Sequence, residues 1–448
     1  MGIKVGMVSL GCAKNRVDAE MMMARLKDAG YDLVAEAGMS DVAIVNTCGF
    51  IEDAKKEAID EILELVQLKK EKKIRAIIVT GCLAERYREE IRKEIPEVDA
   101  VIGIGANGSI ADAVAGTLQG EHMQAFPEKT QLPLSGERVQ TTPFYTSYLK
   151  IAEGCDNHCT YCAIPLIRGP FRSRPMEDVL AEAAHLAKNG VRELNVVAQD
   201  TTRYGEDLYD KKKLAELLRK LCQIDGLCWI RVLYTYPDCI TDELLDTIAS
   251  EEKIVKYIDI PLQHSSATVL HRMGRKGDRA SLTALMQKIR SRISNVALRT
   301  TVMVGFPGET EEEFVDLAEF VQDVRFDRLG CFTYSAEEGT AAARMKDQVD
   351  EAVKQKRMEN IMDAQMTIME QKCAARVGQT LPVLVEGYDR YAGSFFGRTP
   401  FDAPEVDGKI FFSAKTHSLN AGELVRVRVT DYMDCDLLGE LEAREAQA

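Results

Sequence analysis

The sequence predicts an α/β protein with an N-terminal doubly wound parallel sheet, a central partial (β/α)6 barrel and a small antiparallel β-barrel at the C-terminus. Three observations support this prediction. Apolar runs alternate with helical stretches over residues 1–120, the alternation resumes six times within residues 147–376, and short β-like segments replace it over residues 377–446. Strand–helix alternation favours parallel sheets, whereas short strands without helices favour a barrel or a sandwich.

The N-terminal part shows four apolar runs separated by three segments with helical periodicity. The predicted strands are Ile3–Leu10, Val42–Thr47, Ile74–Thr80 and Val101–Ile104, and the predicted helices are Lys14–Ala29, Ile51–Lys70 and Ala84–Glu94. Residues 121–146 carry three prolines and no clear period, which indicates a connection between domains.

The central and C-terminal parts differ in their pattern. Six strands are predicted at Tyr148–Ala152, Glu193–Ala198, Trp229–Leu233, Tyr257–Pro261, Leu298–Val304 and Arg328–Tyr334, followed by one long helix over 347–376. Four methionines of this helix, Met358, Met362, Met366 and Met369, have helical spacing and are expected to face the core. Short strands are then expected at Leu381–Val385, Gly393–Gly397, Lys409–Phe412 and Leu424–Thr430.

Composition limits the class of protein. At roughly 150 residues per domain, the 448 residues suit about three domains, and the net charge of −14 favours basic partners over nucleic-acid phosphates. Twelve cysteines indicate either a disulfide framework or metal binding. The N-terminus does not read as a signal peptide, and no apolar run approaches the roughly 18 residues of a membrane span. We therefore expect a cytoplasmic protein with reduced thiols.

Three cysteines follow the first predicted strand of the central part with the spacing C-x3-C-x2-C. They are Cys155, Cys159 and Cys162, with Tyr161 before the last. A four-iron cluster on three thiolates leaves one iron open to a small chelating molecule. The motif resembles the signature of the radical S-adenosylmethionine superfamily, in which that molecule is S-adenosylmethionine. The alternative is a zinc site that includes His158, although closed zinc sites usually pair two separated arms.

Three further cysteines have no spacing signature but share one structural position. Cys12, Cys48 and Cys82 each close a predicted apolar strand and precede a helix. Since the carboxyl ends of parallel strands line one crevice, we expect the three thiols to converge. Any single one of them is more simply explained as a buried inert thiol. Their common position favours a second three-thiolate cluster.

These two cysteine groups, in this order and before a small β domain, resemble the methylthiotransferase family over nearly the whole chain. The resemblance implies an N-terminal cluster domain, a radical domain and a C-terminal TRAM domain. It also implies two 4Fe-4S clusters and two molecules of S-adenosylmethionine, one as methyl donor and one as radical source. It places Tyr161, Gln199, Gln263, Arg299 and Gly305 near the bound S-adenosylmethionine.

The flanking residues resemble the family branch that modifies a protein. The motifs are Ser9–Glu20, Asn46–Ile51, Tyr148–Asn157, Cys162–Gly169, Arg172–Pro175 and Tyr257–His264. This branch adds a methylthio group to the β-carbon of an aspartate in small-subunit ribosomal protein S-twelve, with electrons from a reductant such as flavodoxin or ferredoxin. The tRNA-modifying branch typically has Gln-Met after the first cysteine, where this chain has Ala13-Lys14.

Charge in the C-terminal segment gives an independent indication of the substrate. Residues 378–448 contain seven Lys or Arg and twelve Asp or Glu, a difference of −5. A domain that grips tRNA is usually basic, whereas an acidic one suits a basic ribosomal protein. The alternative function is tRNA adenosine methylthiolation, with Arg426 and Arg428 as a local basic patch.

Overall fold

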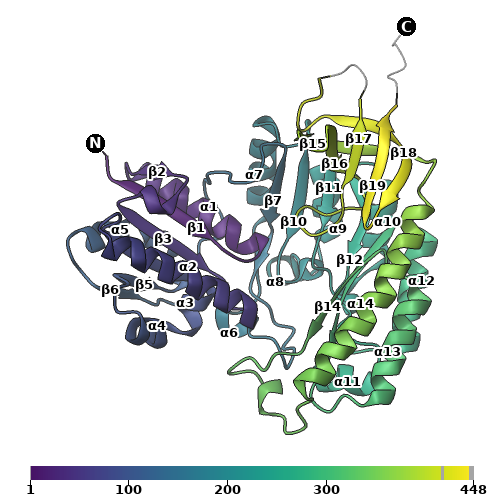
Figure 1. Cartoon of the computed structure of the whole chain (residues 1–448), viewed down its shortest axis with the longest axis horizontal. Helices are drawn as coiled ribbons and strands as arrows, with labels where there is room; N and C mark the ends of the chain where they lie inside the picture. Colours follow the sequence, from purple (N-terminus) through teal and green to yellow (C-terminus); the bar gives the residue numbers. More distant parts are fainter. Residues whose placement is uncertain (1, 415–417, 443–448) are drawn as a thin grey trace.

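The structure is a computed structural model that describes residues 2–414 and 418–442. An N-terminal α/β part lies beside a central part, and a closed β-barrel lies over one end of the central part (Figure 1). No helix within the described residues is long and apolar enough to cross a membrane.

The N-terminal part is a six-stranded parallel sheet in the order β2-β1-β3-β4-β5-β6. Its strands are β1 (Lys4–Ser9), β2 (Asp32–Val34), β3 (Val42–Thr47), β4 (Ala76–Gly81), β5 (Ala100–Ile102) and β6 (Met123–Ala125). Helices α1 (Ala13–Asp28) and α5 (Ile110–Leu118) pack on one face. Helices α2 (Glu52–Lys70), α3 (Cys82–Arg86) and α4 (Arg88–Glu94) pack on the other. Because helices pack on both faces of this sheet, the predicted doubly wound sheet is confirmed.

The segment expected to be a plain connection, 121–146, contains part of this sheet. Strand β6 pairs in parallel with β5, so the sheet continues past residue 120. The strand has only three residues at the sheet edge and carries no apolar run, which explains why its sequence pattern is weak. The same segment buries Leu132.

The central part is an open six-stranded parallel sheet in the order β7-β10-β11-β12-β13-β14. Its strands are β7 (Thr146–Lys150), β10 (Glu193–Val197), β11 (Trp229–Val232), β12 (Ile254–Asp259), β13 (Ala297–Val304) and β14 (Arg328–Thr333). The outer face packs on α7 (Met176–Lys188), α9 (Leu214–Cys222), α10 (Asp242–Ser250), α12 (Arg279–Arg292), α13 (Glu311–Val324) and α14 (Glu351–Ala374). All six predicted strands are present, and β7 and β14 do not pair, which confirms the partial barrel.

The methionine prediction for the long helix is wrong for Met362 and Met366, whereas Met358 is partly buried and packs against the central core. Helix α14 buries Ile361 and Ile368 against the barrel, whereas Met362 and Met366 are 37% and 45% exposed. Both sets recur at helical spacing, so periodicity alone does not decide which stripe faces the core. The β-branched isoleucines fill the buried stripe, and the flexible methionines lie mainly outside it.

The C-terminal part is a closed five-stranded barrel in the order β15-β16-β17-β19-β18. Its strands are β15 (Thr380–Asp389), β16 (Ser394–Arg398), β17 (Ile410–Ser413), β18 (Leu424–Met433) and β19 (Asp436–Leu441). The pairs are antiparallel except β17 with β19, which is parallel. The barrel agrees with the prediction, which missed only β19.

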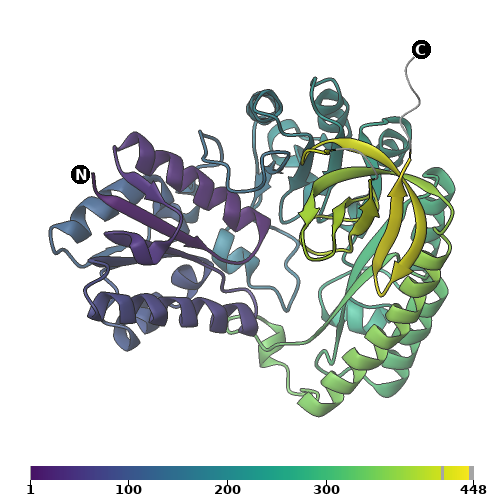
Figure 2. The ribbon, with the colours of Figure 1, turned by 45° about the horizontal axis from the view of Figure 1, so that its top comes forward.

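The chain between β16 and β17 covers the amino-terminal end of the central barrel. Arg398 pairs with Glu193, the first residue of β10, at 2.5 Å, and Tyr257 donates a hydrogen bond to Asp407 at 2.6 Å. The opposite, carboxyl end of the barrel stays beside the N-terminal part, whose strands also point toward the centre of the molecule (Figures 1 and 2). This arrangement leaves the carboxyl ends of both sheets to form a common site.

Candidate metal centre

The three isolated cysteines come together at the carboxyl edge of the N-terminal sheet. Cys12 follows β1, Cys48 follows β3, and Cys82 follows β4 directly. A Cβ added to Gly11 would lie 2.8 Å from the Cys48 sulfur, so the loops after β1 and β3 touch here. Gly11 has φ +85°, a conformation that favours glycine. The strand order reverses direction between β1 and β3, and ligands of open α/β sheets bind at such a switch point.

The three thiols differ in acidity. Burial raises the pKa of Cys82 to about 12, although the Arg168 guanidinium acts in the opposite direction. Burial also raises the pKa of Cys48. For Cys12, burial is outweighed by the cations of Lys14 and Arg168, so its pKa falls below the usual value. Two basic side chains therefore lie close enough to favour thiolates at this edge.

The other three cysteines lie in the loop between β8 (Ala152–Glu153) and α6 (Ile164–Arg168). The pKa of Cys155 is raised to about 11 and that of Cys162 to about 12, mainly by burial, with neighbouring cysteines of the loop acting in the same direction. The Ile164 N–H donates a hydrogen bond to the Cys162 sulfur at 3.5 Å. The loop thus gathers three thiols at the carboxyl end of the first barrel strand.

Arg275 supplies a cation to this loop. Its guanidinium is 3.8 Å from the Cys159 sulfur and 3.5 Å from the Tyr161 hydroxyl, and it donates to the Pro261 carbonyl at 2.7 Å. Its guanidinium carbon also lies 4.3 Å from the centroid of the Tyr236 ring. Arg275 is 7% exposed, so its charge is little screened by water.

Arg168 connects the two cysteine groups. It lies at the end of α6 and donates to the Cys82 sulfur at 3.4 Å and to Asn15 Oδ1 at 3.0 Å. It also pairs with Asp18 of α1 and with Glu153, 3.3 Å away. In addition, Cys82 packs against Ala163 and Ile167. The helix that follows the C-x3-C-x2-C loop is therefore in direct contact with the N-terminal thiols.

Lys150 completes a buried network of four charges. It pairs with Glu153 at 2.8 Å and with Asp18, and these three side chains and Arg168 are at most 2% exposed. Burial would raise the pKa of Glu153, but Lys150 and Arg168 hold it at about 2. Two cations and two carboxylates thus balance in charge between the two groups of thiols.

The three thiols of each group are the type of donor that a four-iron cluster takes. Within residues 2–414 and 418–442, no three His, Cys, Asp or Glu side chains are grouped so as to hold one metal ion. This finding gives no support to the zinc alternative, and His158 is exposed. A four-iron cluster binds its thiolates through different iron atoms, so its ligands lie further apart than those of one ion. The arginine beside each group suits the negative charge of such a centre.

Three of the predicted cofactor contacts lie at carboxyl ends of barrel strands. Gln199 follows β10 and its side-chain amide donates to Glu153, while its side-chain oxygen Oε1 is buried and has no hydrogen-bond partner among the described residues. Gln263 follows β12 with φ +74°. Gly305 follows β13, and a Cβ there would lie 2.2 Å from the Lys354 side chain. Tyr161 lies in the cysteine loop, with its ring edge-on to Phe306.

Arg299 needs correction as a cofactor contact. It lies near the amino end of β13, and its guanidinium pairs with Asp407 at 3.1 Å and approaches Asp259 at 3.7 Å. Asp407 belongs to the segment that covers the amino end of the barrel. Arg299 therefore holds the C-terminal part in place and does not face the carboxyl end of the barrel. Its position along the strand, six residues before Gly305, was the signal that could have excluded it.

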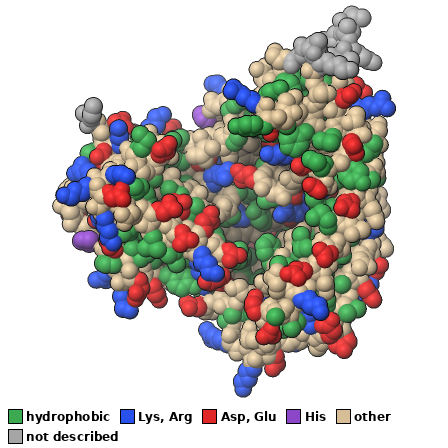
Figure 3. All heavy atoms as spheres, in the orientation of Figure 1, with side chains coloured by type: hydrophobic (Ala, Val, Ile, Leu, Met, Phe, Trp, Pro, Cys, Tyr) green, Lys and Arg blue, Asp and Glu red, His purple; other side chains and the backbone are tan. Residues whose placement is uncertain are grey.

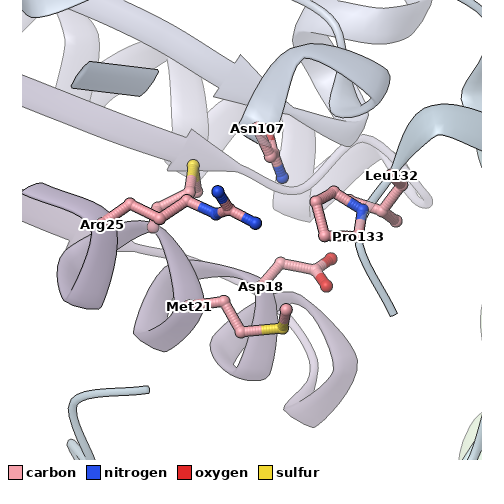
Figure 4. Close-up of a pocket in the computed structure, with 7 residues that line it drawn as sticks. Asp18, Met21, Arg25, Asn107, Leu132 and Pro133 are labelled. Carbon is pink, nitrogen blue, oxygen red and sulfur yellow. The ribbon is translucent and has the colours of Figure 1, made fainter. Parts of the chain in front are cut away.

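Neither of two cavities is lined by a cysteine. One of about 10 Å³ lies beside Asp18 and Met21 of α1, with Asn107 and Pro133 opposite (Figure 4). Its volume is about enough for one water molecule. Another of about 350 Å³ lies at the amino ends of the barrel strands, between Phe144 and Gly422. By contrast, Figure 3 shows that the molecule is hollowed between the N-terminal and central parts, with basic and acidic side chains along the hollow.

Three basic residues of this site were not predicted from the sequence. They are Lys14, Arg168 and Arg275, which lie beside Cys12, Cys82 and Cys159 respectively. For Lys14 and Arg168 the available signal was their place within the motifs that contain Cys12 and Cys162. Arg275 is more than a hundred residues from its cysteine, and no local pattern marks it.

Three family descriptions match consecutive parts of the chain. Residues 4–103 match "Uncharacterized protein family UPF0004", residues 149–321 match "Radical SAM superfamily", and residues 377–441 match "TRAM domain". The solved structures that resemble the chain include the radical S-adenosylmethionine methyltransferase TsrM from Kitasatospora setae. That structure has a TM-score of 0.58 and 14% identity, covering 74% of this chain and 75% of TsrM. The likeness shows the fold.

Curated relatives resemble the chain over its whole length. One from Lachnoclostridium phytofermentans is 49% identical over 98% of this chain and 100% of its own length. Another, from Pelotomaculum thermopropionicum, is 50% identical over 98% of this chain and 99% of its own length. Both are named "Ribosomal protein uS12 methylthiotransferase RimO".

Proposed function

The chain belongs to the ribosomal protein uS12 methylthiotransferase (RimO) family of radical S-adenosylmethionine enzymes, and we propose that it adds a methylthio group to the β-carbon of an aspartate in uS12. The link that Arg168 makes between the two three-cysteine groups carries this proposal. A single centre would suffice to cleave S-adenosylmethionine, whereas sulfur insertion needs a second place that holds sulfur near the reacting carbon. The Arg168 contact with Cys82 and Glu153 brings these two places together.

We propose the six cysteines as the cluster ligands. Cys155, Cys159 and Cys162 would hold one four-iron cluster, and the thiols after β1, β3 and β4 would hold the other. When bound, the first cluster supplies an open iron for S-adenosylmethionine and the electron for its cleavage. The chain's own groups orient these ligands: the Ile164 N–H donates to Cys162, and Arg275 places a cation beside Cys159.

We further propose that Tyr161, Gln199, Gln263 and Gly305 contact S-adenosylmethionine. Gln199 has a buried carbonyl oxygen without a partner, which suits a donor on a ligand. Gln263 donates its backbone N–H to the Thr301 carbonyl and accepts from the Met303 N–H, so β13 fixes its unusual conformation. Backbone strain held by neighbours in this way is typical of ligand sites.

We propose that the substrate is a protein and that tRNA is not modified. The C-terminal part is acidic, and Arg426 of the suggested basic patch forms an ion pair with Glu442 at 3.0 Å. This pairing reduces the charge that β18 offers to a phosphate backbone, on which nucleic-acid affinity depends. We place the enzyme in the cytoplasm, where thiols stay reduced and a flavodoxin or ferredoxin can supply electrons.

Mass spectrometry of a deletion strain tests the substrate. The uS12 protein of the deletion should lack the added methylthio mass at one aspartate, and a plasmid copy should restore it. The tRNA nucleosides of both strains should be the same. A uS12 protein that keeps the modification in the deletion would refute the proposal, and loss of a methylthio nucleoside would favour the tRNA alternative.

Cluster-ligand variants test the two centres separately. Anaerobically reconstituted protein should hold about eight irons, and the variants Cys82→Ala and Cys155→Ala about four each. With dithionite, Cys82→Ala should still form 5′-deoxyadenosine from S-adenosylmethionine but no methylthio product, whereas Cys155→Ala should form neither. Cys331→Ala is the matched control, because Cys331 is as buried as Cys82 but lies on β14. Equal iron contents in all variants would contradict the ligand assignment.

A further inference from the structure

Lys14 is a buried cation that the proposed chemistry does not yet use. It follows Cys12 by two residues, is 8% exposed, and its Nζ lies 3.3 Å from the centroid of the Tyr234 ring. The other buried lysines of the described chain, Lys150 and Lys354, each form an ion pair with a carboxylate. Lys14 is in none of the ion pairs within residues 2–414 and 418–442, and its ammonium group lies over the face of the Tyr234 ring, close to the Cys12 thiol.

Tyr234 is held firmly in place under this ammonium group. It follows β11 at the carboxyl end of the barrel and has φ +59°, which is rare for an aromatic residue. Its N–H donates to Asp259 at 2.9 Å, and its carbonyl accepts from the Thr201 N–H at 3.0 Å. The surrounding strands thus fix a strained backbone that presents the ring to Lys14, which is typical of a ligand site.

Lys14 and Tyr234 lie together at the place where a substrate must enter. Lys14 starts α1 at the cysteine edge of the N-terminal sheet, and Tyr234 lies at the same barrel end as the C-x3-C-x2-C loop. A side chain that receives sulfur from one centre and loses hydrogen near the other must pass between these two parts. Lys14 and Tyr234 join them at this place.

We propose that Lys14 binds the carboxylate of the substrate aspartate, with the Tyr234 ring as the floor of this subsite; the proposal rests on the function proposed above. An ammonium group offers three donors and a full charge, and a carboxylate accepts them strongly in a site with little water. Since the β-carbon is bonded directly to the carboxylate carbon, holding the carboxylate fixes the reacting carbon. An asparagine or a nucleobase lacks the negative charge, so Lys14 selects an acidic side chain.

A double-mutant cycle on binding tests the pairing without relying on turnover. The probes are two peptides of uS12 that differ only at the target position, one with aspartate and one with asparagine. Their dissociation constants are measured anaerobically by fluorescence anisotropy with holoenzyme that carries Lys or Met at position 14. The wild type should bind the aspartate peptide about tenfold more tightly than the asparagine peptide, and Lys14→Met should bind both about equally.

Three further variants separate this role from others. Lys14→Arg keeps the charge and should retain part of the preference, whereas Lys14→Gln, which is polar but neutral, should lose it. Lys354→Met removes a lysine of similar burial that is paired with Glu351, and it should keep the tenfold preference. Iron content and the visible spectrum verify that each variant holds its clusters.

The outcomes distinguish the inference from the proposed function. If Lys14→Met keeps the wild-type preference, or if its only effect is on the cluster spectrum, Lys14 serves the cluster and the inference is wrong. A wild type that binds both peptides alike also overturns it. If the wild type modifies no uS12 at all, the proposed function fails first and the inference fails with it.

Discussion

The buried network between the two cysteine groups gives a quantitative prediction for Arg168. Replacing this arginine by methionine, which has a similar unbranched stem, leaves Asp18 and Glu153 with Lys150 as their one cation. All these groups are at most 2% exposed, so water does not compensate the lost charge. Removing one partner from such a buried network usually costs roughly 3–5 kcal/mol.

The pKa of Glu153 gives an independent figure. Burial would raise this pKa, but Lys150 and Arg168 hold it at about 2, compared with 4.5 in a free side chain. A difference of this size corresponds to about 3 kcal/mol in favour of the ionised carboxylate. Since Arg168 supplies the second largest favourable interaction after Lys150, its loss should remove a large share of that stabilisation.

Hydrogen–deuterium exchange of the intact apoprotein measures the loss of local stability in the helices that carry the charged network. Helix α1 carries Asp18, so its backbone amides should exchange faster in Arg168→Met than in the wild type. The ratio of the two exchange rates should correspond to a loss of a few kcal/mol in the free energy of local opening. Arg174→Met is the matched control, because Arg174 is equally buried but pairs with Glu182 of α7. Adding Asp18→Asn to Arg168→Met restores the charge balance and should recover part of the protection. An α1 that exchanges as in the wild type, or a double variant no better than the single one, would refute the reasoning.

Other predictions concern the rest of the molecule. Burial would raise the pKa of Glu193, but two arginines hold it at about 2; Glu193→Gln should therefore cost about 3 kcal/mol at pH 7. The difference in the free energy of unfolding between the wild type and Glu193→Gln, measured with urea, should decrease as pH falls from 4.5 toward 2. A difference that stays constant over this range would contradict the prediction. Gly11→Ala should reduce bound iron by about half, because its Cβ would meet the Cys48 sulfur at 2.8 Å. Ile361→Ala should cost about 2–5 kcal/mol and Met362→Lys less than about 0.5, as measured by thermal unfolding.

The main strands were predictable because they are buried on both faces. Central strands such as β3 and β4 are buried along their whole length and contain runs of apolar residues in the sequence. Strands β2 and β6, which the prediction missed, each have three residues and lie at the two edges of the N-terminal sheet. An edge strand is less enclosed than a central one, so its sequence need not be an apolar run. Strand β19 is separated from β18 by only two residues, so its start has little local signal.

The cysteines were predictable, but their electrostatic partners were not. Cysteines at strand ends are marked by the apolar run before them, and C-x3-C-x2-C is marked by its spacing. Arg168 contacts Asp18, which is 150 residues away, and Arg275 contacts Cys159 from 116 residues away. Such contacts depend on how segments far apart in the sequence come together in the fold, and no residue nearby in the sequence indicates them. Arg299 differs, because its position near the amino end of β13, six residues before Gly305, was a local signal against a cofactor contact, although its partner Asp407 comes from a distant part of the chain.

The placement of the two arginines shows how the parts of the chain depend on one another. Arg275 and the thiols of its loop belong to the same barrel, so that centre can assemble within the central part alone. Cys82 instead receives its arginine from α6, which directly follows the cysteine loop of the barrel. The N-terminal thiols therefore have their full electrostatic environment only when the central part is docked against them. We therefore expect assembly of the N-terminal cysteine site to depend on the docking of the central part, through the contacts of Arg168 with Cys82 and Glu153.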